Sequence, residues 1–184
     1  MKRATQRGLL AAATVMLATA AQAAPVQWTT GPGANGHYYD FIQSAGITWT
    51  AADAAASSSV FLGAPGHLVT ITSNDENTFV ANLFSGDFRA WIGLTDTAVE
   101  GTYQWVTGET FSYNNWSAGE PSGDGDYVEL FASNDKWNDR PNTPFEPPVA
   151  SYIVEYSTVP EPASLALLGL GLGGLGYFRR KGRS

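Results

Sequence analysis

The sequence predicts an α+β fold, because two helix signatures lie in its first half, strand signatures dominate its second half, and the folded region begins and ends with strands. One domain is expected for 184 residues. After a Gly/Pro-rich loop at Trp28–Gly36, the aromatic run His37–Ile42 indicates the first strand.

The first helix is expected to begin at a capping box, Thr50–Asp53, and to fade near Ser57–Ser59. Gly63–Gly66 then interrupts the chain, and the alternation in His67–Thr72 indicates a short strand. A second capping box, Ser73–Glu76, opens the second helix.

Apolar residues continue the second helix at helical spacing until Ser85–Gly86. The rest of the domain is β-rich, with candidate strands at Ala90–Leu94, Tyr103–Val106, Tyr127–Phe131, Lys136–Asn138 and Ser151–Tyr156. The long loop Thr107–Asp126 separates two of them, and loops of this length in compact domains tend to carry function.

The two ends of the chain differ in composition from the middle. Met1–Ala23 has a basic start, an apolar run and a small-residue cleavage site, which predicts a signal peptide. At the other end, Val159–Pro162 precedes the apolar stretch Leu165–Phe178 and then Arg179 and Arg180. A helix over that stretch would span roughly 21 Å of a bilayer core of roughly 30 Å, so a marginal transmembrane helix and a transient inner-membrane anchor are expected.

This C-terminal pattern, residues 159–184, resembles the PEP-CTERM sorting signal of Gram-negative bacteria. The resemblance implies processing by an exosortase-type membrane protease, in bacteria that make extracellular polysaccharide. It leaves residues 24–158 as the folded domain, which would be exported across the inner membrane and then held at the cell surface or released.

The folded domain is strongly acidic. Between Ala24 and Val159 only Arg89, Lys136 and Arg140 are basic, whereas 16 of the 17 acidic residues lie there, a net charge of −13. This charge argues against nucleic acid as a partner, because phosphates require cationic side chains. The chain has no cysteine, so its stability is expected to rest on a hydrophobic core.

Acidic and amide side chains are concentrated between Glu120 and Asp139, among glycines and turn residues. Carboxylate and amide oxygens on a curved backbone are the ligands that Ca²⁺ prefers. A zinc site is not expected, because His37 and His67 have no partner at ligand spacing.

The motifs in this half of the chain resemble those of the C-type lectin-like domain. They follow the family's order, as Trp91–Leu94, Glu100–Gly101, Tyr103–Gly108, Asn115–Trp116, Glu120–Ser122, Tyr127–Leu130 and Trp137–Asp139. The resemblance covers about His37 to Tyr156. It implies a fold with two helices, small antiparallel sheets and a long loop region that binds calcium and sugar.

Carried over from the family, the metal ligands would be Glu120, Ser122, Asp126, Asn138 and Asp139. Glu120, Ser122 and Asn138 would also bind carbohydrate hydroxyl groups. The family holds the position of Pro121 in the cis conformation. Asp96, Glu100 and Asp126 fall at positions that match the family's auxiliary calcium site, although exposed loop acids remain an alternative interpretation there.

Two departures from the family imply weak calcium binding. Ser122 replaces the usual Asn or Asp, and its hydroxyl is shorter and uncharged. Gly125 stands where the family usually has Glu, so Asp124 or Asp126 would have to substitute. Such a site is typical of a low-affinity extracellular module.

The sequence therefore predicts a calcium-dependent carbohydrate-binding protein that recognises bacterial exopolysaccharide or a surface glycan. The alternative is a lectin-like scaffold for protein binding or matrix structure, without calcium or sugar. An enzyme is not expected, because acids in open loops are poorly placed for the pKa tuning that glycoside hydrolysis needs. Trp91, Trp105 and Trp137 are expected in the core, and Trp116 as an anchor of the long loop.

Overall fold

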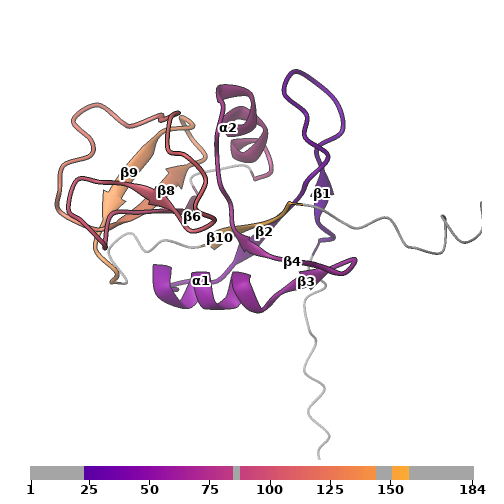
Figure 1. The fold of residues 1–184 in the computed structure, drawn as a ribbon, viewed down its shortest axis with the longest axis horizontal. Coiled ribbons are helices and arrows are strands. Elements are labelled where there is room, and N and C mark those ends of the chain that lie inside the picture. The colour runs from indigo at the N-terminus through magenta and orange to yellow at the C-terminus, as the bar shows by residue number, and fades with distance from the viewer. Residues whose placement is uncertain (1–22, 85–87, 144–150, 158–184) are drawn as a thin grey trace, which may run out of the picture.

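The structure is a computed structural model that describes residues 23–84, 88–143 and 151–157. Two helices, α1 (Trp49–Ser58) and α2 (Asn74–Ala81), lie on opposite sides of the central strands (Figure 1). The strands are β1 (Val26–Gln27), β2 (Tyr38–Gln43), β3 (Val60–Phe61), β4 (Ala64–Pro65), β5 (His67–Leu68), β6 (Arg89–Thr95), β7 (Gln104–Trp105), β8 (Tyr127–Phe131), β9 (Trp137–Arg140) and β10 (Ser151–Tyr156).

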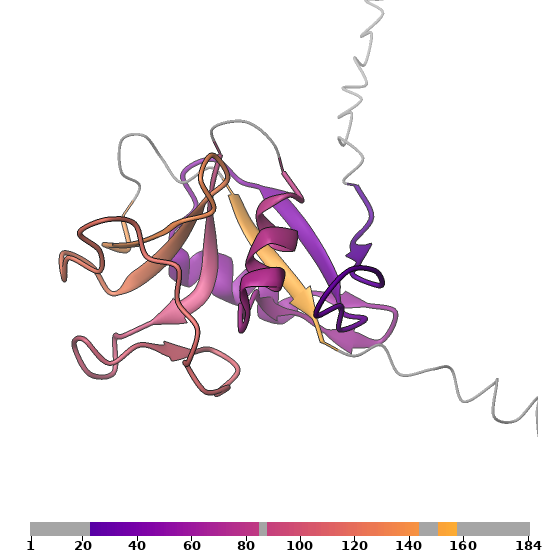
Figure 2. The same cartoon turned by 90° about the horizontal axis from the view of Figure 1, so that it is seen from above.

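The strands form one eight-stranded sheet and one separate hairpin, β3–β4. The main order is β1-β2-β10-β6-β8-β9, with β5 paired to β10 and β7 paired to β6. The α+β class is confirmed. The predicted small antiparallel sheets are instead joined into one mixed sheet, because β10 pairs antiparallel with β2 and parallel with β6. Seen from above, β8 and β9 lie at one end and β3–β4 at the other (Figure 2).

The first helix begins earlier than the capping box at Thr50–Asp53 predicted. Its N-cap is Thr48, whose side chain accepts a hydrogen bond from the backbone N–H of Ala51 at 3.3 Å. Trp49 then opens the helix, and its buried indole N–H donates to the Ile92 carbonyl at 2.8 Å. The start of the helix is thus fixed by a tertiary contact to β6 that local sequence does not reveal.

The second helix begins as predicted, with Ser73 accepting from the N–H of Glu76 at 3.2 Å. The other half of the capping box is absent, because the Glu76 carboxylate accepts from the N–H and hydroxyl of Thr72 instead. The helix ends at Ala81, before the predicted Ser85–Gly86, and residues 85–87 lie outside the described residues.

Several strands have the predicted positions, and β8 and β10 have the predicted bounds. The predicted strand His67–Thr72 is shorter, because only His67–Leu68 pairs as a strand. Val69 then bridges two neighbours, donating its N–H to Ile153 and accepting from Gly93. The short strands β1, β3 and β4 were not expected.

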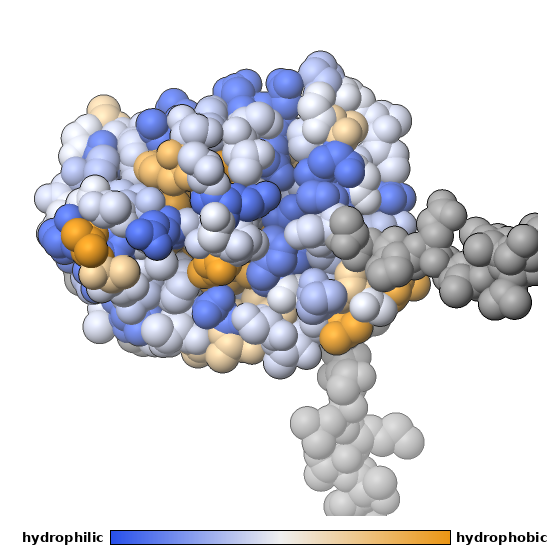
Figure 3. Space-filling model, viewed as in Figure 1, coloured by the Kyte–Doolittle hydropathy of each residue, from blue (hydrophilic) through white to orange (hydrophobic). Residues whose placement is uncertain are grey.

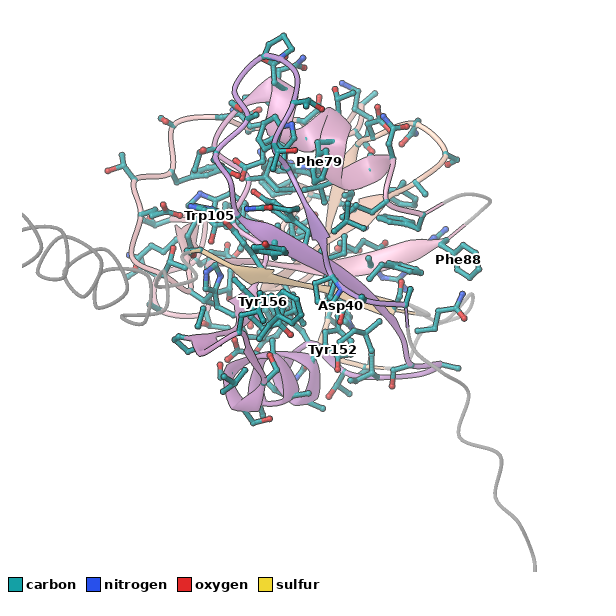
Figure 4. The ribbon with its side chains drawn as sticks, turned by 90° about the vertical axis from the view of Figure 1, so that its right-hand side faces the viewer. Asp40, Phe79, Phe88, Trp105, Tyr152 and Tyr156 are labelled. Carbon is teal, nitrogen blue, oxygen red and sulfur yellow. The ribbon has the colours of Figure 1, made fainter. Side chains whose placement is uncertain are left out.

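Two hydrophobic clusters form the core, one on each side of the sheet. Phe79 packs on the α2 side, while Tyr152 and Tyr156 lie on the α1 side (Figure 4). Trp91, Trp105 and Trp137 are buried, as predicted for core residues.

The segments predicted to direct export fall outside the described residues. The signal peptide, Met1–Ala23, is described only at its last residue, and the apolar stretch Leu165–Phe178 not at all. Within the described ranges, neither helix has the length and apolar character needed to cross a bilayer.

Candidate calcium and carbohydrate site

Asp139 on β9 is the centre of the predicted ligand group. Its carboxylate is fully buried and accepts hydrogen bonds from the backbone N–H groups of Ser122 at 2.9 Å and Gly123 at 2.7 Å. The hydroxyl of Tyr103 adds a bond at 3.3 Å. Asp139 thereby holds the turn after Pro121 against β9, and the peptide bond between Glu120 and Pro121 is cis, as the family resemblance implied.

Glu120 lies beside Asp139, close enough for each carboxyl group to shift the pKa of the other. Burial, and next the hydrogen bond with Asp139, raise the pKa of Glu120. Burial opposes ionisation of Asp139 too, but hydrogen bonds from Glu120, Ser122 and Gly123 outweigh it and lower the pKa of Asp139. Asp139 is thus the more readily ionised of the two acids, and none of the salt bridges among the described residues includes either group.

Ser122 contributes both its backbone and its side chain to this group. Its N–H also donates to Oε2 of Glu120 at 2.9 Å, and its Oγ lies 3.3 Å from Oδ1 of Asp139. The structure thus brings three of the predicted ligands together, Glu120, Ser122 and Asp139. Carboxylate and hydroxyl oxygens of this kind are hard ligands that fit Ca²⁺.

Asn138 is directed elsewhere. Its side-chain NH₂ donates to the Asp139 carbonyl at 2.9 Å and reaches Glu129 at 3.5 Å, the limit of a hydrogen bond. The strand register explains this, since Asn138 is opposite Glu129 and Asp139 is opposite Val128, on alternate faces of the β8–β9 pair. In this conformation the NH₂ group binds the Asp139 carbonyl and Glu129 rather than the Glu120 and Asp139 carboxyl groups.

The auxiliary residues differ in burial, because Asp96 is buried and Glu100 is exposed. Asp96 is 2% exposed, and its Oδ2 accepts from the N–H of Gly101 at 2.8 Å. Its Oδ1 is buried without a hydrogen-bond partner. Glu100 Oε1 approaches Gly123, close to the turn that Asp139 holds. An unsatisfied buried carboxylate oxygen is an acceptor that a cation would satisfy.

Asp126 is joined to the auxiliary residues through its backbone carbonyl rather than through its side chain. Its carbonyl accepts from the Thr95 hydroxyl at 2.7 Å and from the N–H of Asp96 at 3.2 Å.

Burial raises the pKa of the Tyr103 hydroxyl, and the charges of Asp139 and Asp96 raise it further. Tyr103 therefore remains a neutral hydrogen-bond donor between the two acidic groups.

Gly125 explains why the family's Glu is missing from this loop. A Cβ atom at Gly125 would overlap the backbone of Arg140 and Pro141. No side chain fits there in this backbone, so the site lacks that carboxylate. Across the described ranges, no three acidic or histidine side chains form a group that could hold a metal ion by themselves.

One important residue of the region was missed by sequence reasoning. Glu129 on β8 is fully buried and accepts from Arg140 at 3.1 Å, while Arg89 lies 3.5 Å away. Burial raises the pKa of Glu129, although both guanidinium groups oppose this shift. The available signal was the scarcity of basic residues, because two of only three in the domain pair with one buried acid.

Trp116 is a structural anchor of the loop, as expected. Its backbone bridges to Trp137, and their rings meet edge to face with centroids 5.8 Å apart. The Tyr103 ring packs on it at 4.9 Å. This packing leaves residues 120–126, which we call the acidic turn, as the most exposed part of the region.

Comparison with known proteins identifies the fold and the C-terminal motif. The family model of the Lectin C-type domain matches residues 47–144, which is more than half of the chain. The chain belongs to the C-type lectin domain family. A second family model, the PEP-CTERM protein-sorting motif, matches residues 158–181. Both resemblances predicted from the sequence are confirmed.

Individual relatives show how far the similarity extends. Halomucin of Haloquadratum walsbyi is 31% identical over 139 residues, which cover 66% of this chain and 1% of halomucin. The chain therefore spans a very small part of that relative. Among solved structures, the C-type lectin CEL-I from Cucumaria echinata has a TM-score of 0.58 at 26% identity, covering 72% of this chain and 96% of CEL-I. A second structure is the cow C-type carbohydrate-recognition domain of CD23, solved in the presence of a GlcNAc2Man3 oligosaccharide. It has a TM-score of 0.54 at 28% identity, and the match covers 65% of this chain and 86% of the CD23 domain.

Proposed function

We propose that this chain is an exported, calcium-dependent carbohydrate-binding protein whose target is a bacterial exopolysaccharide or surface glycan. The observation that carries the proposal is the pairing of the Glu120 and Asp139 carboxyl groups on a turn that Asp139 itself holds. Two carboxyl groups held side by side are a place where a divalent cation would offset the repulsion between their charges.

Glu120, Asp139 and the Ser122 hydroxyl would hold the ion. When bound, Ca²⁺ would supply open coordination positions for two neighbouring sugar hydroxyl groups. Asp139 fixes the turn through the N–H groups of Ser122 and Gly123, and Glu120, which is partly exposed, lies just before this turn. Asn138 would complete the site only after its amide turns away from Glu129.

A second ion would fit at the auxiliary residues. The unsatisfied Oδ1 of Asp96 and the nearby Glu100 supply two carboxylates beside the primary group. Asp126 is the third residue proposed for this position, and its carbonyl already bonds the backbone of Asp96.

Relatives support carbohydrate as the ligand class. The CD23 domain was solved in the presence of an oligosaccharide, and CEL-I is described as a lectin. The lectin family and fold are typically non-catalytic, which supports binding rather than hydrolysis as the function. The PEP-CTERM motif supports export, exosortase processing and a final position at the cell surface or outside the cell, with a transient inner-membrane anchor before processing.

The decisive experiment is calcium titration by calorimetry on the full chain, followed by a glycan array with calcium or with EDTA. We expect calcium binding in the weak range of extracellular modules and glycan binding that EDTA abolishes. Asp139→Asn should abolish both, while Asp75→Asn, an exposed acid on α2, should leave both unchanged. Glycan binding that persists in EDTA would refute the calcium mechanism.

A second candidate is a lectin-like scaffold that binds neither calcium nor sugar. It is favoured by the saturation of the Asp139 carboxylate, which already accepts from two backbone N–H groups and Tyr103. A melting temperature that calcium does not change, together with an empty glycan array, would support the scaffold.

A further inference from the structure

The β3–β4 hairpin exposes the two most accessible large apolar side chains among the described residues. Val60 is 67% exposed and Leu62 is 62% exposed. Figure 3 shows apolar residues, in orange, gathered at the lower right where this hairpin lies. Two neighbouring exposed aliphatic side chains on one hairpin tip suggest a contact surface rather than random exposure.

The hairpin is held firmly in this position. Phe61 packs between Tyr38 and Tyr156, with ring centroids 5.0 and 5.5 Å apart. Leu62 has a φ of +49°, in the left-handed region that residues with a side chain rarely adopt, and Gly63 follows at +91°. The tight turn therefore keeps the Leu62 side chain pointing outward despite a backbone cost.

The hairpin lies beside the point where the chain leaves the domain. Tyr156, which contacts Phe61, ends β10, and the sorting motif begins at residue 158. The apolar stretch Leu165–Phe178 starts about nine residues after Tyr156, a separation of at most about 30 Å in an extended chain. Any surface that receives this stretch is thus within reach of the hairpin.

The hairpin also lacks the charge that would oppose such a contact. The domain carries a net charge of −13, yet residues 54–66 contain no charged side chain. Acidic side chains would be repelled by anionic lipid and costly to desolvate, and none of these residues brings one.

We propose that the β3–β4 hairpin seats Val60 and Leu62 in the interfacial layer of a lipid bilayer while the C-terminal stretch is anchored there. This inference rests on the transient anchoring proposed above. It would orient the domain, because β8 and β9 with the acidic turn lie at the end of the molecule far from the hairpin (Figures 1 and 2). The carbohydrate site would then face away from the membrane.

The absence of cysteine makes the test direct. The full chain carrying Leu62→Cys, labelled with the fluorophore NBD, is reconstituted in phosphatidylethanolamine–phosphatidylglycerol vesicles with or without a spin-labelled quencher lipid. Val99→Cys is the matched control, because Val99 is an equally apolar side chain, 59% exposed, outside the hairpin. We expect the quencher lipid to reduce emission at least twofold at position 62 and by less than a tenth at position 99.

Vesicle flotation of the same samples separates the possible failures. A chain that floats, with equal quenching at both positions, would overturn the hairpin proposal and leave the anchor intact. A chain that does not float would overturn both. Self-quenching of the position 62 label between copies in lipid-free detergent, without lipid quenching, would identify a second copy as the partner and also overturn the proposal. None of these outcomes depends on calcium or sugar, so the carbohydrate proposal is tested separately.

Discussion

At the scale of single residues, Asp139 has two roles that oppose each other. Its buried carboxylate accepts from the backbone of Ser122 and Gly123 and so fixes the turn. The same carboxylate lies against Glu120, whose pKa is raised by burial and by this neighbour. The carboxylate that fixes the turn is thus also the one that lies beside a second acid.

Glu120→Gln should separate stability from binding. Glutamine can still donate a hydrogen bond to Asp139, and it removes the repulsion between the two carboxylates. The metal-free chain should therefore melt a few degrees higher, which corresponds to a gain of about 1 kcal/mol in the free energy of unfolding. Calcium affinity should fall by about tenfold or more, because one carboxylate ligand is lost. Differential scanning calorimetry and calcium titration measure the two effects, and a variant that loses stability in the metal-free state would contradict the proposed repulsion.

His37 should make the domain sensitive to alkaline pH. Its Nδ1 lies 2.6 Å from Oε1 of the buried Glu155, and this hydrogen bond chiefly raises the pKa of His37, while burial opposes it and the charges of Glu155, Glu76 and Glu109 add to it. A raised histidine pKa contributes stability below pH 6.5 that is lost as pH rises through the folded-state pKa.

We therefore expect the free energy of unfolding to fall by about 1 kcal/mol or less between pH 6 and pH 9, measured by urea denaturation. Burial also raises the pKa of Glu76, so the contribution of Glu76 to stability likewise falls as the pH rises above 4.5. His37→Gln should flatten the profile. His67→Gln, which removes the chain's other histidine, is the comparison variant, and an unchanged slope in His37→Gln would reject this assignment.

At the scale of elements, the long loop depends on close contact with β9. Gly125 lies against the backbone of Arg140 and Pro141 with no space for a Cβ atom. Gly125→Ala should force the loop away from β9, destabilise the domain by about 1–3 kcal/mol and weaken calcium binding. Asp124→Ala, an exposed neighbour, should leave stability within about 0.5 kcal/mol of the parent in urea denaturation.

Elements with strong local signals were predictable from the sequence. The bounds of β8 and β10 and the Ser73 cap follow from alternation and capping chemistry, and these were right. The start of α1 was not predictable, because it is set by the bond from Trp49 to Ile92, 43 residues away. The parallel β6–β10 pair is equally invisible, since it joins the middle of the chain to its end.

The candidate site also has a part that the sequence predicted and a part that it could not predict. Family motifs pointed to Glu120, Ser122 and Asp139, which do meet in the structure. The direction of the Asn138 side chain depends on the β8–β9 register and on a partner, Glu129, that is buried only in the folded state. Neither the strand register nor the burial of Glu129 can be predicted from sequence spacing alone.

At the scale of the whole molecule, the acidic charge should govern stability in the absence of metal. With three basic residues against sixteen acids, the domain repels itself at low ionic strength. Raising NaCl from 10 to 100 mM shortens the screening length from about 30 to about 10 Å and should raise the melting temperature by roughly 2–5 °C. A melting temperature insensitive to NaCl would show that the acids are already compensated.

The attachment of the loop to β9 also bears on how ligand preference can change. Ser117 donates its N–H to the Trp137 carbonyl at 2.8 Å, and Asp139 and Gly125 fix the following turns to the same strand. Exposed side chains between these three attachment positions can be substituted without disturbing the pairing of the strands. Descendants of this sequence could therefore acquire new sugar preferences through a handful of substitutions, while folding and export stay the same.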